Sequence, residues 1–133
     1  GGEPEQIKTS IMAGRMGVMP AGGGLPLTDD EISNVTEYVL QLAGRDHDQI
    51  AAGLGQQVYN KICLACHLPT GTGNQALGAP NLTDNVWLYG SSKAAITETL
   101  RNGRNGVMPA HGEFLGEDKV HLVSAYIYSL SQK

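Results

Sequence analysis

The chain is poor in the residues that build a hydrophobic core. Of its 133 residues only 5% are aromatic, with a single Trp and a single Phe, whereas Gly occurs 18 times. A chain of this length suits one small domain with some extra chain, or a tight pair of domains. Small domains with little apolar material commonly depend on an additional stabilising group. We therefore expect a bound apolar group to supply buried surface that the side chains lack.

Long apolar runs and an excess of positive charge are also missing. The sequence has no stretch of about 18 apolar residues, so we expect no transmembrane helix in this chain. No secretory signal is visible either. The formal net charge of −4 argues against nucleic acid and against a polybasic membrane patch, and it permits steering towards a basic partner.

Cysteine is scarce, and both copies lie in one motif. Cys63 and Cys66 are three residues apart, and His67 follows directly. This is the attachment sequence for a c-type haem. One helical turn lets both sulfurs bond the two vinyl groups at one porphyrin edge, and the next residue then lies under the iron. We predict one covalent haem in this chain, bound to both cysteines, with the His67 imidazole as the proximal ligand.

The cysteine pair has two other interpretations, a redox dithiol and half of a zinc site. A thioredoxin-like dithiol belongs in a βαβ context, which the sequence lacks. A zinc site needs four ligands, and outside the motif only His47, His111 and His121 are scattered along the chain. Both alternatives stay open, although neither is completed by a second motif.

The second axial ligand is predicted to be Met108. It lies in Gly106-Val107-Met108-Pro109, 41 residues after His67. A thioether opposite an imidazole raises the haem potential and suits electron transfer. A distal ligand from His111 or His121 is the alternative.

An internal repeat divides the chain. Shifted by 89 residues, residues 14–21 match residues 103–110 at seven of eight positions, and such self-similarity indicates a repeated unit. We interpret residues 1–43 as the C-terminal half of a first haem domain that lacks its haem-attachment motif. Residues 44–46 are then a linker, and residues 47–133 a complete haem domain.

Met19 repeats the Met108 motif without a haem of its own. We expect it to be idle, packed, or borrowed by a neighbouring molecule through domain swapping of residues 1–43. It competes with Met108 for the same iron, and Met108 should win because it is tethered in the same predicted domain as His67.

The hydrophobic periodicity predicts an all-α fold. Thr28 and Glu31 form a capping box at the start of one helix, and no segment alternates long enough for a strand. The predicted helices are 3–13, 28–43, 46 or 48 to 62, 91 or 92 to 101, and 117–130. The predicted buried stripes are Ile32, Val35, Val39 and Leu42; Ile50, Leu54, Val58 and Ile62; and Val120, Val123, Ile127 and Leu130, with Tyr126 at a helix crossing.

Residues 47–131 resemble class I c-type cytochromes in the order of their motifs: a glycine-containing first helix, Cys-x-x-Cys-His, Pro-Asn-Leu, Met-Pro and a closing helix with an aromatic. Residues 76–90 and 102–111 are more narrowly similar to the C-terminal haem domain of the dihaem subunit III of C-family (cbb-type) cytochrome c oxidases. The resemblance implies a class I cytochrome c fold around one covalent haem, preceded by a half-domain of one short and one longer helix.

The resemblance also implies a haem pocket around the motif. In the family, the proline matching Pro80 orients the proximal histidine through its carbonyl, a role that fits the general rule for metal-bound histidines. Trp87 and Tyr89 are expected to form pocket wall with polar tips within reach of a propionate, and Arg104 pairs with a propionate or is a solvated loop arginine. The expected pocket residues are Pro80, Asn81, Leu82, Trp87, Tyr89 and Arg104.

The function implied is one-electron transfer without catalysis in this chain itself, on the periplasmic side of a bacterial inner membrane. A donor cytochrome would pass electrons through subunit III to the oxidase core subunits, where oxygen is reduced. A membrane anchor and a second haem are expected only in the full-length parent. The alternatives are a freestanding periplasmic dihaem electron carrier and, from another class, a haem enzyme or gas sensor.

Overall fold

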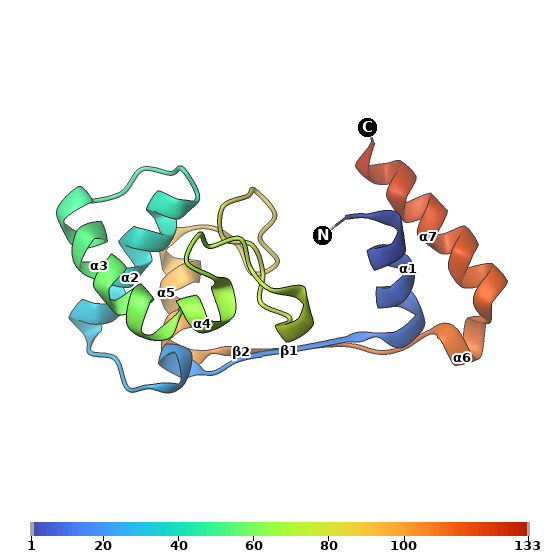
Figure 1. The fold of residues 1–133 in the computed structure, drawn as a ribbon, viewed down its shortest axis with the longest axis horizontal. Helices are drawn as coiled ribbons and strands as arrows, with labels where there is room; N and C mark the ends of the chain where they lie inside the picture. The colour runs from blue at the N-terminus through green and yellow to red at the C-terminus, as the bar shows by residue number, and fades with distance from the viewer. Residues whose placement is uncertain (1, 133) are drawn as a thin grey trace. The chain divides into compact units, whose positions relative to one another are not determined.

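The computed structural model describes residues 2–132, most of them helical (Figure 1). Residues 1 and 133, the outer ends of the two predicted domain ranges, lie outside the described part. The longer helices are α1 (Pro4–Ala13), α2 (Asp29–Leu42), α3 (Gln49–Ile62), α5 (Lys93–Asn102) and α7 (Glu117–Ser131). The shorter helical turns are η1 (Ala21–Gly24), α4 (Leu64–His67), η2 (Gln75–Leu77) and α6 (Gly112–Leu115). The five predicted helices are confirmed, and the capping box of Thr28 and Glu31 is present.

The prediction that the chain has no sheet is wrong, because β1 (Arg15–Met19) pairs with β2 (Arg104–Met108). Both strands follow a glycine with φ near +70°, Gly14 and Gly103. A side chain at Gly14 would overlap the Met108 carbonyl oxygen, and one at Gly103 would overlap that of Met19. The start of each strand therefore faces the end of the other, which is an antiparallel pairing. Five-residue strands that pair over such a sequence distance leave no local alternation to detect.

The internal repeat is confirmed by the element bounds. The start and end of α5 and β2 lie 89 residues after those of α1 and β1. The start of α7 lies 88 residues after that of α2, matching the one-residue slip seen in the sequence. Each repeat half therefore folds into the same local order: helix, strand, short turn, helix.

The structure separates into two compact units that do not follow the predicted ranges 1–43 and 47–133. Unit 2 is Val18–Asn105, and unit 1 combines the chain up to Gly17 with the chain from Gly106 onward. Helix α2 therefore belongs with α3, and α7 belongs with α1, so no boundary falls at the predicted linker 44–46. The physical reason is that α2 and α7 carry the same apolar pattern, so the sequence does not say which of them covers α3.

Unit 2 is organised by the crossing of α2 and α3. A side chain at Gly55 of α3 would overlap the carbonyl group of Asn34 in α2, so the two backbones approach closely. The rings of Tyr38 and Tyr59 meet edge to face with centroids 5.1 Å apart, a favoured aromatic geometry. The core of this unit is Ile32, Val35, Tyr38, Val39, Leu40, Ala52, Val58, Tyr59, Leu82, Ile96 and Leu100.

Glu37 joins three helices of unit 2. Its side chain is almost fully buried, and its carboxylate pairs with Lys93 of α5 and accepts a hydrogen bond from the backbone N–H of Asp48 at the start of α3. The hydrogen bond from Lys93 is the main reason why the pKa of Glu37 is lowered, against the opposing effect of burial. A second ion pair joins Arg101 of α5 to Asp29 of α2 at 2.8 Å.

Two of the predicted buried stripes need correction. In α3, Ile50 is 81% exposed and Leu54 49% exposed, because the close contact at Gly55 turns a different face towards α2. The buried face of this helix is Ala52, Gly55, Val58 and Tyr59. In α7 only Val120 of the predicted stripe is buried, while Val123, Ile127 and Leu130 are each at least 39% exposed. Tyr126, predicted to lie in the core at a helix crossing, is 65% exposed.

Unit 1 consists of α1 packed against α7. Ile11 and Val120 are buried there, and the backbone N–H of His111 donates to the carbonyl of Ile11. Lys8 forms an ion pair with Glu117 at 3.3 Å. This pair repeats the α2·α5 packing of unit 2 without a counterpart of α3.

Candidate haem-attachment site

The turn that carries the motif, residues 63–67, continues directly from the end of α3 at Ile62. The Cys63 N–H donates to the Tyr59 carbonyl, and the His67 N–H donates to the Cys63 carbonyl at 2.9 Å. Residues three apart on a helical turn share one face, so the two cysteine side chains project from the same side. Both cysteines are free. One turn of helix therefore presents two thiols and one imidazole, as the attachment chemistry requires.

The environment of Cys63 argues against the redox-dithiol interpretation. Burial, with a smaller contribution from Cys66, raises the pKa of the Cys63 thiol to about 11. Redox-active Cys-x-x-Cys motifs instead hold a thiol with a lowered pKa, because the thiolate is the reactive form.

The His67 imidazole is prepared to act as a ligand through one nitrogen. It is 6% exposed, and its Nδ1 lies 3.1 Å from the carbonyl oxygen of Pro80. A carbonyl only accepts, so Nδ1 carries the proton and Nε2 keeps the lone pair that a metal binds. Burial lowers the pKa of His67, which favours the neutral ligating form, and the Pro80 hydrogen bond opposes that effect in part.

The loop after the motif brings the Pro80 carbonyl to His67. The Gly73 N–H donates to the His67 carbonyl, and Asn74 pairs with Ala79 through two backbone hydrogen bonds. Gly73 has φ +79°, and a Cβ there would lie 2.5 Å from the carbonyl carbon of Pro80. Only glycine allows this approach, so Gly73 fixes the carbonyl that orients the imidazole.

Tyr59 has a role that the sequence analysis missed. Its hydroxyl donates to the carbonyl of Leu68 at 2.7 Å, directly after His67. Leu68 has φ +67°. This left-handed backbone conformation is unfavourable for a residue with a bulky side chain. Burial raises the pKa of Tyr59 to about 12, so the hydroxyl remains a donor. The sequence does contain a signal for this role. Tyr59 lies among apolar residues of a helix, and the hydroxyl of a buried tyrosine needs a hydrogen-bond partner.

The remaining pocket residues predicted from the resemblance lie in unit 2. Leu82 is buried in the core, and Trp87 packs against it. The polar tip of Trp87 donates to the carbonyl of Asp84, and the guanidinium of Arg104 stacks 4.3 Å from the ring centre of Tyr89. Asn81 accepts two hydrogen bonds from Thr83, one from the backbone N–H and one from the hydroxyl.

The two methionine loops are divided between the units. Met19 lies in unit 2 and packs, partly buried, against its core, as do Cys63 and Leu64. Met108 lies in unit 1 and is 39% exposed. The structure therefore does not bring Met108 into the same unit as His67, and its ligand role stays a prediction.

The residues at the motif fit a covalent haem c. Two free cysteines one turn apart match thioether attachment, and a buried imidazole with Nδ1 already bonded matches an axial ligand. Within residues 2–132, by contrast, no group of three or more His, Cys, Asp or Glu side chains could hold a metal ion. The zinc interpretation therefore gains no support from this part of the chain.

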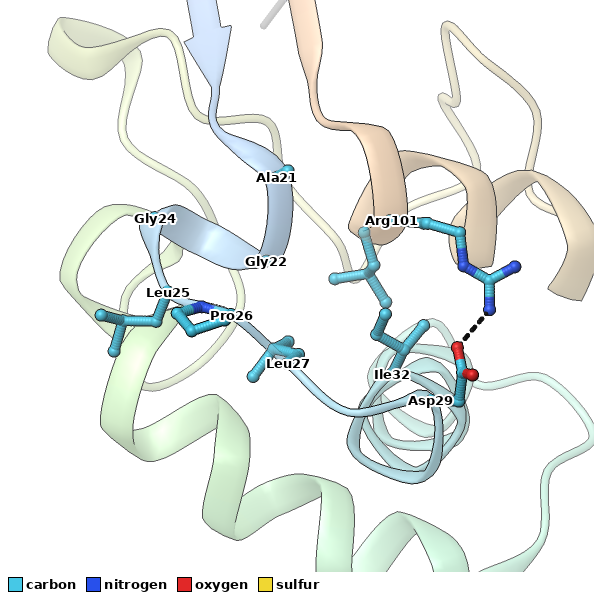
Figure 2. A pocket seen from close by; sticks show the side chains of 10 residues that line it. Ala21, Gly22, Gly24, Leu25, Pro26, Leu27, Asp29, Ile32 and Arg101 are labelled. Atoms are coloured by element: carbon cyan, nitrogen blue, oxygen red, sulfur yellow. Dashed lines mark hydrogen bonds and ion pairs between the residues drawn. The ribbon is translucent and has the colours of Figure 1, made fainter.

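An open pocket of about 430 Å³ lies between the segment that leads into α2 and the end of α5 (Figure 2). The Asp29–Arg101 ion pair lies at its edge, and Leu25 and Leu27 point from the connecting segment. Cys63, Cys66 and His67 are not among the residues that line this pocket.

None of the helices in residues 2–132 is both long and apolar enough to cross a bilayer. The family model for cytochrome c oxidase, cbb3-type, subunit III, matches residues 51–127. This range contains the attachment motif, its supporting loop and Met108.

Curated relatives match nearly the whole chain. The cbb3-type cytochrome c oxidase subunit CcoP of Rubrivivax gelatinosus is 40% identical over 132 residues, which is 99% of this chain and 43% of the relative. CcoP of Cereibacter sphaeroides is 41% identical over 140 residues, 98% of this chain and 48% of the relative. The cbb3-type cytochrome c oxidase subunit FixP of Azorhizobium caulinodans is 43% identical over 125 residues, which is 93% of this chain and 42% of the relative.

The chain thus spans less than half the length of these relatives. The comparisons give no support to the predicted domain swapping through residues 1–43. They agree with the helical fold and with the attachment motif at 63–67, and the match covers more than half of the chain. The chain belongs to the cytochrome c oxidase, cbb3-type, subunit III family.

Proposed function

We propose that this chain binds one haem c through Cys63 and Cys66 and transfers single electrons as part of the electron-entry subunit of a cbb3-type oxidase. The observation that carries the proposal is the buried His67, whose Nδ1 is bonded to Pro80 beside two free cysteines. The names of the relatives support the oxidase assignment. In this proposal the chain only transfers electrons, and the core subunits of the oxidase reduce oxygen.

When bound, the haem supplies an iron that cycles between its ferric and ferrous states. The chain's residues hold the two ligand atoms still in both states. Pro80 fixes the imidazole orientation, Tyr59 holds the backbone after His67, and the core around Leu82 and Trp87 excludes water. A rigid, dry site of this kind keeps both ligands bound, and polarity and hydrogen bonding around it set the potential.

The Gly-Val-Met-Pro loop at residues 106–109 would supply the second ligand of the iron through the thioether sulfur of Met108. Electrons would arrive from a donor cytochrome on the periplasmic side and leave to the oxidase core subunits.

The test is haem attachment in a host that matures c-type cytochromes. We expect one iron and one haem per chain, and the haem should stay with the polypeptide under denaturing extraction. Cys63→Ser with Cys66→Ser should abolish covalent attachment. His67→Ala should lose the six-coordinate spectrum, whereas His121→Ala, at an exposed histidine of α7, should keep it. A colourless chain that binds zinc stoichiometrically would contradict the proposal.

A further inference from the structure

The loop that follows the attachment motif is bonded to α3 through the hydroxyl of one tyrosine. Tyr59 is 0% exposed, and its hydroxyl donates to the carbonyl of Leu68 at 2.7 Å. The backbone N–H of Gly71 donates to the same carbonyl at 3.1 Å. A carbonyl oxygen has two lone pairs, so the Leu68 carbonyl joins the helix on one side to the loop on the other.

The same loop carries the carbonyl that orients His67. The Leu82 N–H donates to the Gly71 carbonyl at 2.7 Å. Two residues before Leu82, the Pro80 carbonyl oxygen lies 3.1 Å from Nδ1 of His67. Gly71 and Leu82 are both buried, and hydrogen bonds are stronger where the surroundings exclude water. The segment that presents the Pro80 carbonyl is thus bonded to the residues that the tyrosine anchors.

Leu68 itself has a backbone conformation that its surroundings must hold. Its φ of +67° lies in the left-handed region, which a residue with a bulky side chain keeps only when neighbouring groups fix it. A relaxed Leu68 would turn the peptide group directly after His67 and displace the bond to Gly71. The Tyr59 hydroxyl is a donor from a regular helix, so it fixes Leu68 against a rigid element.

We propose that Tyr59 is a positioning residue for the histidine ligand of the iron: through Leu68 and the loop, its hydroxyl sets the strength of the His67–Pro80 hydrogen bond and thereby the reduction potential of the bound haem. This inference rests on the proposed haem attachment. A hydrogen bond from Nδ1 to a carbonyl makes Nε2 more basic, and a more basic ligand favours the ferric iron over the ferrous iron. Loosening the loop should therefore raise the potential.

The first test compares Tyr59→Phe with Tyr38→Phe in the holoprotein. Tyr59→Phe removes only the hydroxyl and leaves Gly71 bonded to the Leu68 carbonyl, so the chain should still fold and attach haem. An equilibrium redox titration should show its potential shifted upward. Tyr38→Phe is the matched control and should keep the wild-type potential, since Tyr38 is also buried and its ring meets that of Tyr59 edge to face. An unchanged or lowered potential in Tyr59→Phe, or equal shifts in both variants, would overturn the proposal.

Amide hydrogen exchange tests the loop by a measurement that does not involve electron transfer. In Tyr59→Phe the amides of Gly71 and Leu82 should exchange about two- to tenfold faster, which corresponds to the loss of one hydrogen bond. The Ile96 amide, which donates to the Ser92 carbonyl at the start of α5, should keep its wild-type rate. Equal acceleration at Ile96 would show a general loss of stability and overturn the positioning role.

Failed haem attachment in the wild-type chain would refute the proposed function, whereas exchange at Gly71 and Leu82 in the haem-free chain would still test whether the Tyr59 hydroxyl holds the loop. Normal attachment with unchanged exchange in Tyr59→Phe would refute the positioning role alone.

Discussion

The two helix pairs, α2·α5 in unit 2 and α1·α7 in unit 1, are built from the same repeat yet differ in burial. In α2 the apolar stripe is covered by α3, and buried side chains meet across the crossing at Gly55. In α7 only Val120 and Ser124 are buried, against α1. This difference shows that the sequence of an amphipathic helix defines which face can be buried. The neighbouring elements determine how much of that face is buried.

The largest expected effect is at the closest approach in unit 2. Gly55→Ala should destabilise the chain by about 3 kcal/mol, because the new methyl group overlaps the Asn34 backbone. Gly53→Ala is the matched control in the same helix, since nothing lies within 4 Å of its position. It should stabilise by about 0.5–1 kcal/mol through helix propensity. Urea unfolding measures both, and equal effects would show that α2 does not cross α3 at Gly55.

A smaller effect on stability is expected when Val35 and Val123, which occupy equivalent positions in the two repeat halves, are replaced by alanine. Val35→Ala should cost about 2 kcal/mol, because two buried methyl groups are lost from a position that is 0% exposed. Val123→Ala, at a position that is 39% exposed, should cost less than about 0.5 kcal/mol. Thermal or urea unfolding of the two variants measures the contrast. A reversed order would mean that α7, not α2, has the buried face.

The smallest effect concerns pH and the Glu37 bridge. The pKa of Glu37 is lowered from its ordinary value of 4.5 chiefly by the Lys93 hydrogen bond. The unfolded chain therefore takes up a proton at higher pH than the folded one. The resulting stability is fully present above pH 4.5 and is lost as the pH falls through the lower folded pKa.

Glu37→Gln removes this titration. As the pH falls below 4.5, the wild-type chain should lose stability that the variant does not lose. Glu113→Gln, at an exposed carboxylate of α6, is the control and should follow the wild-type profile. Parallel profiles for wild type and Glu37→Gln would show that the bridge does not contribute to folding.

Local features were predicted well because their causes lie within a few residues. The capping box of Thr28 and Glu31, the helix bounds and the one-turn spacing of Cys63 and Cys66 follow from short-range rules. The role of the Pro80 carbonyl came from the family resemblance, and the structure shows that hydrogen bond. The Tyr59–Leu68 hydrogen bond and the β1–β2 pairing were missed, since each depends on where a distant carbonyl or strand lies.

The sequence by itself determined the helices, the repeat and the one-turn spacing of Cys63 and Cys66, because periodicity, caps and motif spacing are local. Only the tertiary structure decided which repeat half covers α3. Two nearly equivalent faces were available, and the choice falls to contacts between distant residues, such as Glu37 with Lys93 and the Asp48 backbone. A pattern shared by both halves cannot distinguish them, whereas a single carboxylate with its partners in other helices can.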